Sequence, residues 1–278
     1  MEFKKHSQKA KEFVKKTKKM KDHFPKGFKD IHLKRKNVVA LIPNLITLTG
    51  LCVGLSSIRF AFNQQFEYAV IAILIAAVLD MMDGGLARML NSASAIGAEL
   101  DSLSDLVCFG VAPALILYMK GLKNLEHFGW IVVLLYVCCM ALRLARFNVL
   151  SHGPEKPDWS CQFFLGVPAP MGAYLSLSPI MVSLFNPCFE FSDLFYALFV
   201  TVISLLLVSR IPTFSVKKVS VQQKYVLPIM LGAVFLIGFF LTEHWLALSC
   251  LALSYLLSIP FSIKFYKKLQ KKQIVLIN

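Results

Sequence analysis

Eight apolar stretches, each close to the length that a membrane-crossing helix needs, constrain this 278-residue chain more than any other feature. About 20 apolar residues cross the hydrocarbon as a helix, and in lipid only helices and closed barrels satisfy every backbone polar group. The stretches cover residues 39–62, 67–88, 98–119, 128–149, 167–186, 193–210, 225–241 and 244–263. The sequence therefore predicts an all-α polytopic integral membrane protein of about eight transmembrane helices. Six is the main alternative, if the last pair does not span fully.

Basic residues are divided unevenly between the two ends of these stretches. With the amino terminus in the cytoplasm, 27 of the 30 lysines and arginines fall on the inner side, and the outer side keeps Arg59, Lys120 and Lys123. An excess of lysine and arginine is typical of cytoplasmic segments. The pattern predicts that both termini and the link between the second and third helices are cytoplasmic. Because no organelle-targeting signature is readable, the predicted membrane is the bacterial inner membrane.

Four parts follow from the distribution of apolar and charged residues. They are a basic tail (1–38), a core of six helices (39–215), an extra transmembrane hairpin (216–263) and a second basic tail (264–278). The first tail holds 14 lysines and arginines and runs directly into an apolar stretch. The sequence therefore predicts that this tail binds an anionic lipid leaflet and not nucleic acid.

Five carboxylates interrupt the apolar pattern between Ala77 and Gly110, namely Asp80, Asp83, Glu99, Asp101 and Asp105. Side chains three or four residues apart share one face of a helix. One stripe on that spacing ends the second helix, and it comprises Asp80, Asp83, Gly84, Ala87 and Arg88. Another begins the third helix, and it comprises Gly97, Asp101 and Asp105. A short link makes the two helices antiparallel neighbours, so the stripes can face each other, whereas Glu99 falls off the second stripe.

Acids at membrane depth need compensation, since each costs on the order of 3 kcal/mol near the bilayer centre. Three interpretations are open. A salt-bridge network has only Arg88 as a base within this stretch, and an ion path would make the chain a transporter. The third interpretation is metal-assisted chemistry on a phosphate-bearing substrate, because oxygen-only ligand sets suit Mg²⁺, Mn²⁺ or Ca²⁺ and no histidine lies in the cluster. We adopt the third as the working hypothesis.

The order and spacing of these residues, Asp80-x2-Asp83-Gly84-x2-Ala87-Arg88-x8-Gly97-x3-Asp101-x3-Asp105, resemble the signature of the CDP-alcohol phosphatidyltransferase family at all eight of its fixed positions. The resemblance implies a homodimeric membrane transferase of CDP-activated lipids whose site opens to the cytoplasm. It implies a divalent metal, Mg²⁺ or Mn²⁺ with two ions per site, held by Asp80, Asp83 and Asp101. Asp105 would be the general base and a further metal position. Gly84, Ala87, Arg88 and Gly97 would shape the CDP pocket.

Four further segments resemble the branch of this family that uses serine, the membrane-type phosphatidylserine synthases. The segments are Ile42–Gly50, Asp101–Ala114, Arg143–Val149 and Phe163–Ala173. The resemblance implies transfer of the phosphatidyl group of CDP-diacylglycerol to L-serine, which releases CMP. The alternative is a sibling enzyme with another acceptor, such as glycerol 3-phosphate, inositol phosphate or choline.

Two pairs of residues outside the acidic stretch are further candidates for binding. Arg143 and Arg146 lie one turn apart, and they could anchor the helix at the interface or clamp a phosphate or the carboxylate of serine. Asn44 and Thr47 follow Pro43 at the expected start of the first helix. Asn44 could cap that helix, or both residues could contact the CDP-lipid.

Overall fold

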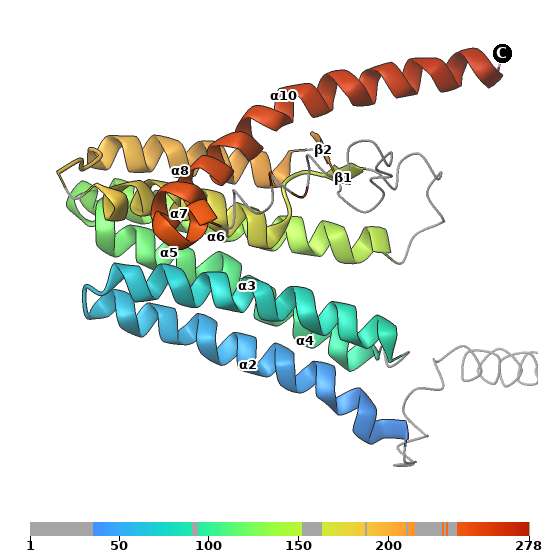
Figure 1. The fold of residues 1–278 in the computed structure, drawn as a ribbon, viewed down its shortest axis with the longest axis horizontal. Helices are drawn as coiled ribbons and strands as arrows, with labels where there is room; N and C mark the ends of the chain where they lie inside the picture. Colours follow the sequence, from blue (N-terminus) through green and yellow to red (C-terminus); the bar gives the residue numbers. More distant parts are fainter. Residues whose placement is uncertain are drawn as a thin grey trace, which may run out of the picture. The chain divides into compact units, whose positions relative to one another are not determined.

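Helices make up most of the chain in the computed structural model, which describes residues 36–90, 94–151, 163–186, 188–209, 211–214, 230, 232 and 238–277. The principal helices are α2 (Lys36–Phe62), α3 (Phe66–Met89), α4 (Ala95–Asp105), α6 (Glu126–Ser151), α7 (Ala169–Phe185), α8 (Asp193–Val208) and α10 (His244–Ile277). Helical backbone also continues from α4 through η2 (Leu106–Val111), α5 (Ala112–Leu117), η3 (Tyr118–Leu122) and η4 (Lys123–Leu125). Figure 1 shows α2, α3 and the stretch from α4 to α5 running alongside one another.

Four helical stretches in the described part are long and apolar enough to cross a membrane: Leu41–Phe62, Phe66–Met89, Ala95–Leu150 and His244–Lys264. The third contains a reversal at Glu126, whose φ of 48° lies outside the helical range, and α6 folds back to contact η2. It therefore accounts for two of the expected spans. The helices α7 and α8 are apolar but shorter.

Seven of the eight predicted spans coincide with helical stretches of the described residues, and the remaining one, 225–241, lies largely outside them. The all-α membrane fold is therefore confirmed. Two details differ from the expectation. The helix α10 continues to Ile277, so most of the predicted tail 264–278 is helical. Two three-residue strands, β1 (Phe163–Leu165) and β2 (Pro212–Phe214), pair antiparallel and were not predicted.

A polar chain of contacts ties three helical elements together inside the apolar core. The fully buried Tyr136 of α6 donates its hydroxyl to the carbonyl of Phe109 in η2, at 3.0 Å. Ser176 of α7 contacts the same hydroxyl at 3.4 Å. Because a buried polar group costs free energy unless it is hydrogen-bonded, these contacts fix how α6 and α7 sit against the element that follows Asp105.

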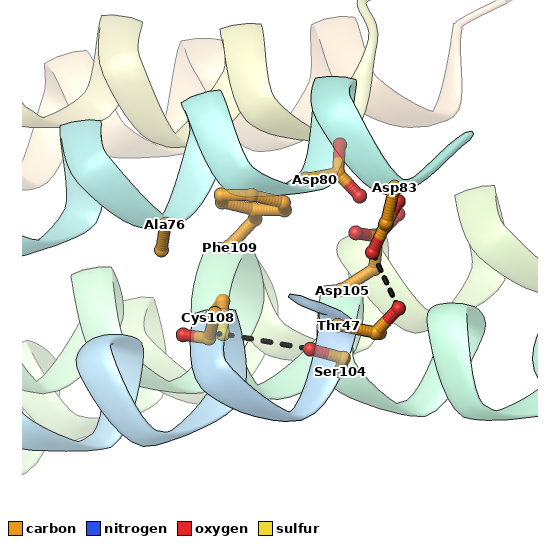
Figure 2. A pocket seen from close by; sticks show the side chains of 9 residues that line it. Thr47, Ala76, Asp80, Asp83, Ser104, Asp105, Cys108 and Phe109 are labelled. Atoms are coloured by element: carbon orange, nitrogen blue, oxygen red, sulfur yellow. Dashed lines mark hydrogen bonds between the residues drawn. The ribbon is translucent and has the colours of Figure 1, made fainter. Parts of the chain in front are cut away.

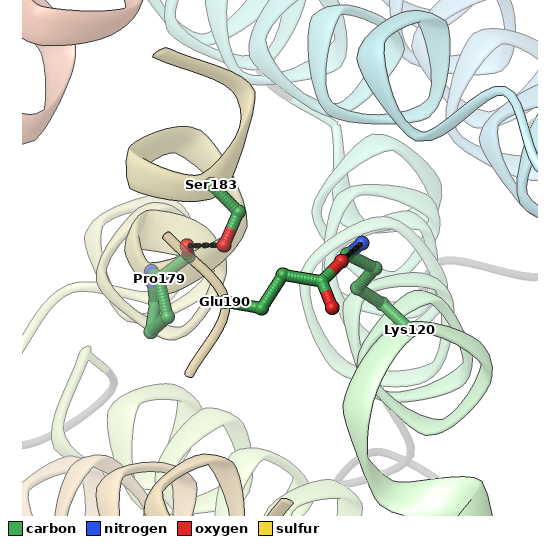
Figure 3. A network of polar contacts seen from close by, with 4 residues as sticks. All are labelled: Lys120, Pro179, Ser183 and Glu190. Atoms are coloured by element: carbon green, nitrogen blue, oxygen red, sulfur yellow. Dashed lines mark hydrogen bonds and ion pairs between the residues drawn. The ribbon is translucent and has the colours of Figure 1, made fainter. Parts of the chain in front are cut away.

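Lys120, one of the few basic residues on the predicted outer side, is engaged in contacts between elements. Its ammonium lies 3.5 Å from Glu190, in the link between α7 and α8, and 5.5 Å from the ring centroid of Phe66. Figure 3 shows this ion pair beside α7, where Ser183 donates to the carbonyl of Pro179. Phe66 is the first residue of α3, whereas Asp80 and Asp83 lie near its last residue. The contacts of Lys120 therefore join η3, α3 and the link between α7 and α8 at the end of α3 that is away from these acids.

Candidate active site

Three aspartates from two helices converge on one point. Asp80, near the end of α3, meets Asp101 and Asp105, in the last two turns of α4, and one carboxylate oxygen from each lies within 4.8 Å of the other two. All three side chains are half-buried. Glu99, on the same helix α4, is exposed and outside this group. The two stripes thus face each other in the structure, as predicted, at Asp80, Asp101 and Asp105. We call these three residues the acid cluster.

Asp83, which was expected beside them as a metal ligand, borders the acid cluster but is not among the three acids whose oxygens lie within 4.8 Å of one another. Its side chain is only 4% exposed, and its carboxylate accepts a hydrogen bond from the hydroxyl of Thr47 on α2. Figure 2 shows this bond next to Asp80 and Asp105. The partner comes from 36 residues away in the chain, so helical spacing alone could not reveal it. In the structure Asp83 is therefore tied to α2 as well as to α3.

A small cavity extends from the acids into the apolar interior. Asp80, Asp83, Asp105 and Thr47 line its polar end, and Cys108 and Phe109 of η2 line the rest together with Gly50, Ala76 and Ser104. The thiol of Cys108 lies 3.8 Å from the hydroxyl of Ser104 and 3.6 Å from the carbonyl of Gly50. The residues that line this small cavity therefore bring α2, α3 and η2 together next to the acids.

A second and larger cavity, of about 530 Å³, opens beside the acid cluster. Its size is in the range of small-molecule binding sites. Eleven residues of α2, α3, α4 and the residue before α4 line it: Pro43, Asn44, Thr47, Asp83, Gly84, Ala87, Arg88, Ser94, Gly97, Ala98 and Asp101. All six residues that the sequence assigned to CDP-lipid binding are among them. The structure thus gathers these residues around one cavity, which we call the nucleotide cavity after their predicted role. That binding role stays a prediction.

Two glycines of the motif shape this cavity in different ways. A β-carbon added at Gly97 would lie 2.9 Å from Oδ1 of Asn44 and 3.0 Å from Oγ of Ser94, so a side chain here would displace the side chains of Asn44 and Ser94. A β-carbon at Gly84 would meet nothing within 4 Å. Gly84 therefore serves no packing contact, and its missing side chain leaves open space in the cavity.

Of the two roles left open for Asn44, capping the first helix is wrong. The helix α2 begins at Lys36 and contains Pro43 in its interior. Asn44 is therefore inside the helix, where it has no cap position to fill. Its side chain contributes to the nucleotide cavity instead, and of the two roles left open for it, contact with the CDP-lipid remains.

Arg143 and Arg146 both contact backbone carbonyls of the chain but occupy different surroundings. The Nε of Arg143 donates to the carbonyl of Val167, just before α7, at 2.6 Å. An Nη2 of Arg146 donates to the carbonyl of Val208, at the end of α8. The charge of Arg143 acts on Asp80 and Asp105. Arg143 therefore interacts electrostatically with two members of the acid cluster while its Nε joins α6 to the residues before α7.

The donor set of the acid cluster fits a hard divalent cation. It offers carboxylate oxygens only, and no histidine or cysteine belongs to the group found among the described residues. Oxygen ligands of one octahedral Mg²⁺ stand about 3.0 Å apart when adjacent and about 4.2 Å apart when opposite, and the three carboxylate oxygens here lie within 4.8 Å of one another. Small side-chain movements would therefore suffice to place all three carboxylates around one ion.

Thr47→Val is expected to weaken the binding of Mn²⁺ about tenfold in the absence of any lipid substrate. The change removes the hydrogen bond that orients Asp83, and losing the partner of a ligand typically costs ten- to a hundredfold in metal affinity. Calorimetric titration of the purified protein with Mn²⁺ measures the effect. Thr49→Val is the matched control, because that exposed hydroxyl bonds only to its own helix, at Leu45. Equal affinities in the two variants would contradict a link between Thr47 and the metal site.

Ser94 lines the nucleotide cavity but was not singled out from the sequence. Its hydroxyl caps α4 by accepting a hydrogen bond from the backbone N–H of Gly97, at 3.0 Å. A serine directly before a helical stretch is a recognised signal for a helix start. The signal was therefore present, and it would also have placed the start of α4 at Ala95 rather than at residue 98.

Comparison with known proteins gives concordant matches along most of the chain. The family model described as CDP-alcohol phosphatidyltransferase matches residues 40–208, and one described as CDP-alcohol phosphatidyltransferase 2 matches residues 224–260. The CDP-diacylglycerol–serine O-phosphatidyltransferase of Mycobacterium leprae is 39% identical over 224 residues, covering 80% of this chain and 74% of the relative. The Helicobacter pylori protein of the same name is 34% identical, covering 66% and 76%. Archaetidylserine synthase of Methanothermobacter thermautotrophicus is 31% identical, covering 61% and 68%.

Proposed function

The chain belongs to the CDP-alcohol phosphatidyltransferase family, and we infer that it transfers the phosphatidyl group of CDP-diacylglycerol to the hydroxyl of L-serine. Phosphatidylserine and CMP are the products. Two relatives that cover 80% and 86% of this chain carry names that specify serine as the acceptor. The structural observation that carries the proposal is the acid cluster beside a cavity lined by the motif residues.

The enzyme is an integral membrane protein, in keeping with its apolar helices and its family. We propose that both termini and the active site face the cytoplasm of a bacterial inner membrane. The distribution of lysine and arginine supports this orientation, and so does the chemistry, because CMP and L-serine are water-soluble. We also propose that the enzyme is a homodimer, as its resemblance to the family implies, and light scattering of the detergent-solubilised protein would measure its mass.

A divalent metal, Mg²⁺ or Mn²⁺, would be held by Asp80, Asp83 and Asp101, with Asp105 as a further position, and the bond from Thr47 to Oδ2 of Asp83 would orient that carboxylate. When bound, the metal supplies positive charge for the diphosphate of the lipid substrate and for the leaving CMP. We propose two ions per site. The number of acids supports this, because four aspartates, two near the end of α3 and two in the last two turns of α4, exceed what one Mg²⁺ usually takes from protein.

In this proposal, the nucleotide cavity binds the CDP part of CDP-diacylglycerol. Arg88 offers a guanidinium for the phosphates, and Asn44 offers an amide for the cytosine or the ribose. The open space at Gly84 lets the nucleotide pass close to the backbone of α3. In this arrangement the diphosphate lies next to Asp101, which borders both the cavity and the acid cluster.

Transfer begins when the hydroxyl oxygen of L-serine attacks the lipid-attached phosphorus of CDP-diacylglycerol. The bond between that phosphorus and the bridging oxygen breaks, and CMP leaves with the bridging oxygen. Asp105 takes the hydroxyl proton, as a general base within the acid cluster. Arg143, whose charge interacts with those of Asp80 and Asp105, can pair with the carboxylate of serine.

The proposed activity is tested by supplying purified protein with CDP-diacylglycerol, L-serine and Mn²⁺ in detergent micelles. We expect CMP and phosphatidylserine to appear in equal amounts, with neither product formed after chelation of the metal. Mass spectrometry of the lipid extract and chromatography of the nucleotides measure both. Ion flux across reconstituted vesicles without CMP release would instead support a transporter and contradict the proposal.

Gly84→Leu is expected to raise the KM for CDP-diacylglycerol at least tenfold while the melting temperature stays near that of the wild type. A leucine here would fill the nucleotide cavity, because nothing lies within 4 Å of its β-carbon position. Gly85→Leu is the matched control, since that position is equally open but does not line the cavity. A similar KM in both variants would show that the cavity does not receive the nucleotide.

A further inference from the structure

The turn that leads into α7 contains a glycine that no other residue replaces easily. Gly166 has a φ of 82°, in the left-handed region that favours glycine. Its backbone N–H donates to the carbonyl of Ile211, at 2.9 Å. A β-carbon at this position would lie 2.9 Å from the carbonyl oxygen of Ser209 and 3.1 Å from that of Leu207. Gly166 therefore lets the turn before α7 lie directly against the backbone at the end of α8.

Two arginines of α6 bind backbone carbonyls on either side of this close approach. The Nε of Arg143 donates to the carbonyl of Val167, the residue after Gly166, at 2.6 Å. An Nη2 of Arg146 donates to the carbonyl of Val208, the last residue of α8. The last carbonyls of a helix have no partner within it, so the bond from Arg146 caps α8. The helix α6 is thereby bound to both segments that meet at Gly166.

Two contacts show which residues of α6 lie level with those of α4 and η2. The side-chain amide of Asn148, on α6, donates to the hydroxyl of Ser102, on α4, at 3.0 Å. A β-carbon added at Gly110, in η2, would lie 3.2 Å from Cγ of Met140, on α6. From the first contact to the second, the chain advances eight residues on one side and goes back eight on the other. The two stretches therefore run antiparallel and side by side between these contacts.

Asp105 and Arg143 both lie between these two contacts. Asp105 is three residues from the first contact along its own helix, and Arg143 is five residues from it along α6. Since an α-helix rises about 1.5 Å per residue, the two residues differ in level by about 3 Å. A guanidinium carries five N–H donors, and the bond from Nε to Val167 uses one of them. The other four can serve a ligand at the level of Asp105.

We propose that Gly166 is a positioning residue, which acts on the acceptor alcohol through Arg143. The turn holds the carbonyl of Val167 in place for the Nε of Arg143, and this bond fixes the plane of the guanidinium. A guanidinium in a fixed plane pairs with a carboxylate through two parallel hydrogen bonds. The turn thus favours an acceptor that carries a carboxylate, as L-serine does. This inference rests on the proposed function and deepens it, because it assigns recognition of the acceptor to the junction of α6 with the start of α7.

Steady-state kinetics of Gly166→Ala test the proposal, with CMP release as the readout. The added β-carbon would meet the carbonyl of Ser209, so the turn must shift and take the carbonyl of Val167 away from Arg143. We expect the KM for L-serine to rise about tenfold, which corresponds to weakening one hydrogen bond to a charged group. We expect kcat and the KM for CDP-diacylglycerol to stay within about twofold of the wild type, because neither depends on this bond.

Gly172→Ala is the matched control. Its β-carbon would lie 2.5 Å from Cδ2 of Leu207, so it disturbs the packing of α7 on α8 without reaching the turn. We expect its KM for serine to equal that of the wild type. Thermal unfolding of both variants compares their stability. If Gly166→Ala does not fold, Gly166→Asn takes its place with the same expected rise, because asparagine adopts a positive φ more readily than alanine.

A double-mutant cycle with Arg143→Lys separates positioning from a merely structural effect. If Gly166 acts through Arg143, adding Gly166→Ala to Arg143→Lys raises the KM for serine no further. Multiplying effects, a loss confined to the KM for the lipid, or equal behaviour of Gly166→Ala and Gly172→Ala would each overturn the inference. The proposed function stands or falls separately, on whether the wild-type protein releases CMP with L-serine.

Discussion

Asp105→Asn is expected to lower the turnover number about a thousandfold while the protein still binds Mn²⁺ and CDP-diacylglycerol. A general base contributes roughly a hundred- to ten-thousandfold to a proton-transfer step. The amide of asparagine keeps the size of the carboxylate and one oxygen, but it cannot accept the serine proton. Asp105 shares the acid cluster with Asp80 and Asp101, so the remaining two carboxylates still hold the metal.

Glu99→Gln is the matched control for this variant. Glu99 lies on α4 like Asp105, but its side chain is exposed and outside the acid cluster. We therefore expect wild-type turnover from it. Unchanged turnover in Asp105→Asn would contradict the role of Asp105 as the base. If Mn²⁺ binding were lost together with turnover, the main role of Asp105 would be that of a metal ligand and not that of the general base.

Asp80→Asn is expected to weaken Mn²⁺ binding about a hundredfold or more and to abolish activity at ordinary metal concentrations. Asp80 is the only member of the acid cluster that comes from α3, and it faces both carboxylates of α4. Changes to the partners of metal ligands already cost ten- to a hundredfold, so loss of a charged ligand should cost at least the upper end of that range. Calorimetric titration with Mn²⁺ measures the affinity directly, without reference to catalysis.

Glu67→Gln provides the control on the same helix. Glu67 is an exposed acid in the first turn of α3, at the end away from the acid cluster. Its neutralisation changes the net charge as Asp80→Asn does, so a purely electrostatic effect on cation binding would appear in both variants. Equal Mn²⁺ affinities for Asp80→Asn and the wild type would show that the metal binds elsewhere.

The parts of the site that repeat along one helix could be predicted from the sequence. Asp101 and Asp105 share a face of α4 because they are one turn apart, and the short link after α3 brings Asp80 to them. The periodicity of a helix is a local property, so four residues of spacing already decide which side chains share a face. The same reasoning set Glu99 aside, and it is exposed in the structure.

The parts that depend on distant segments could not be predicted in this way. Asp83 was grouped with the other acids, but its partner Thr47 comes from another helix. Directly after Asp105 the backbone becomes π-helical in η2, which adds a residue to the turn and changes the face on which Cys108 and Phe109 fall. Strands β1 and β2 pair across almost 50 residues. These features follow from tertiary packing, which periodicity does not encode.

The most direct test of the central claim is a competition between acceptors in a single reaction. Purified protein, CDP-diacylglycerol and Mn²⁺ are mixed with equal concentrations of L-serine, glycerol 3-phosphate, inositol phosphate and choline, and the lipid products are quantified together with CMP. We predict phosphatidylserine as the only new lipid, with one CMP released for each molecule formed. Another phospholipid as the main product, or CMP released without phosphatidylserine, would contradict the assignment of serine as the acceptor.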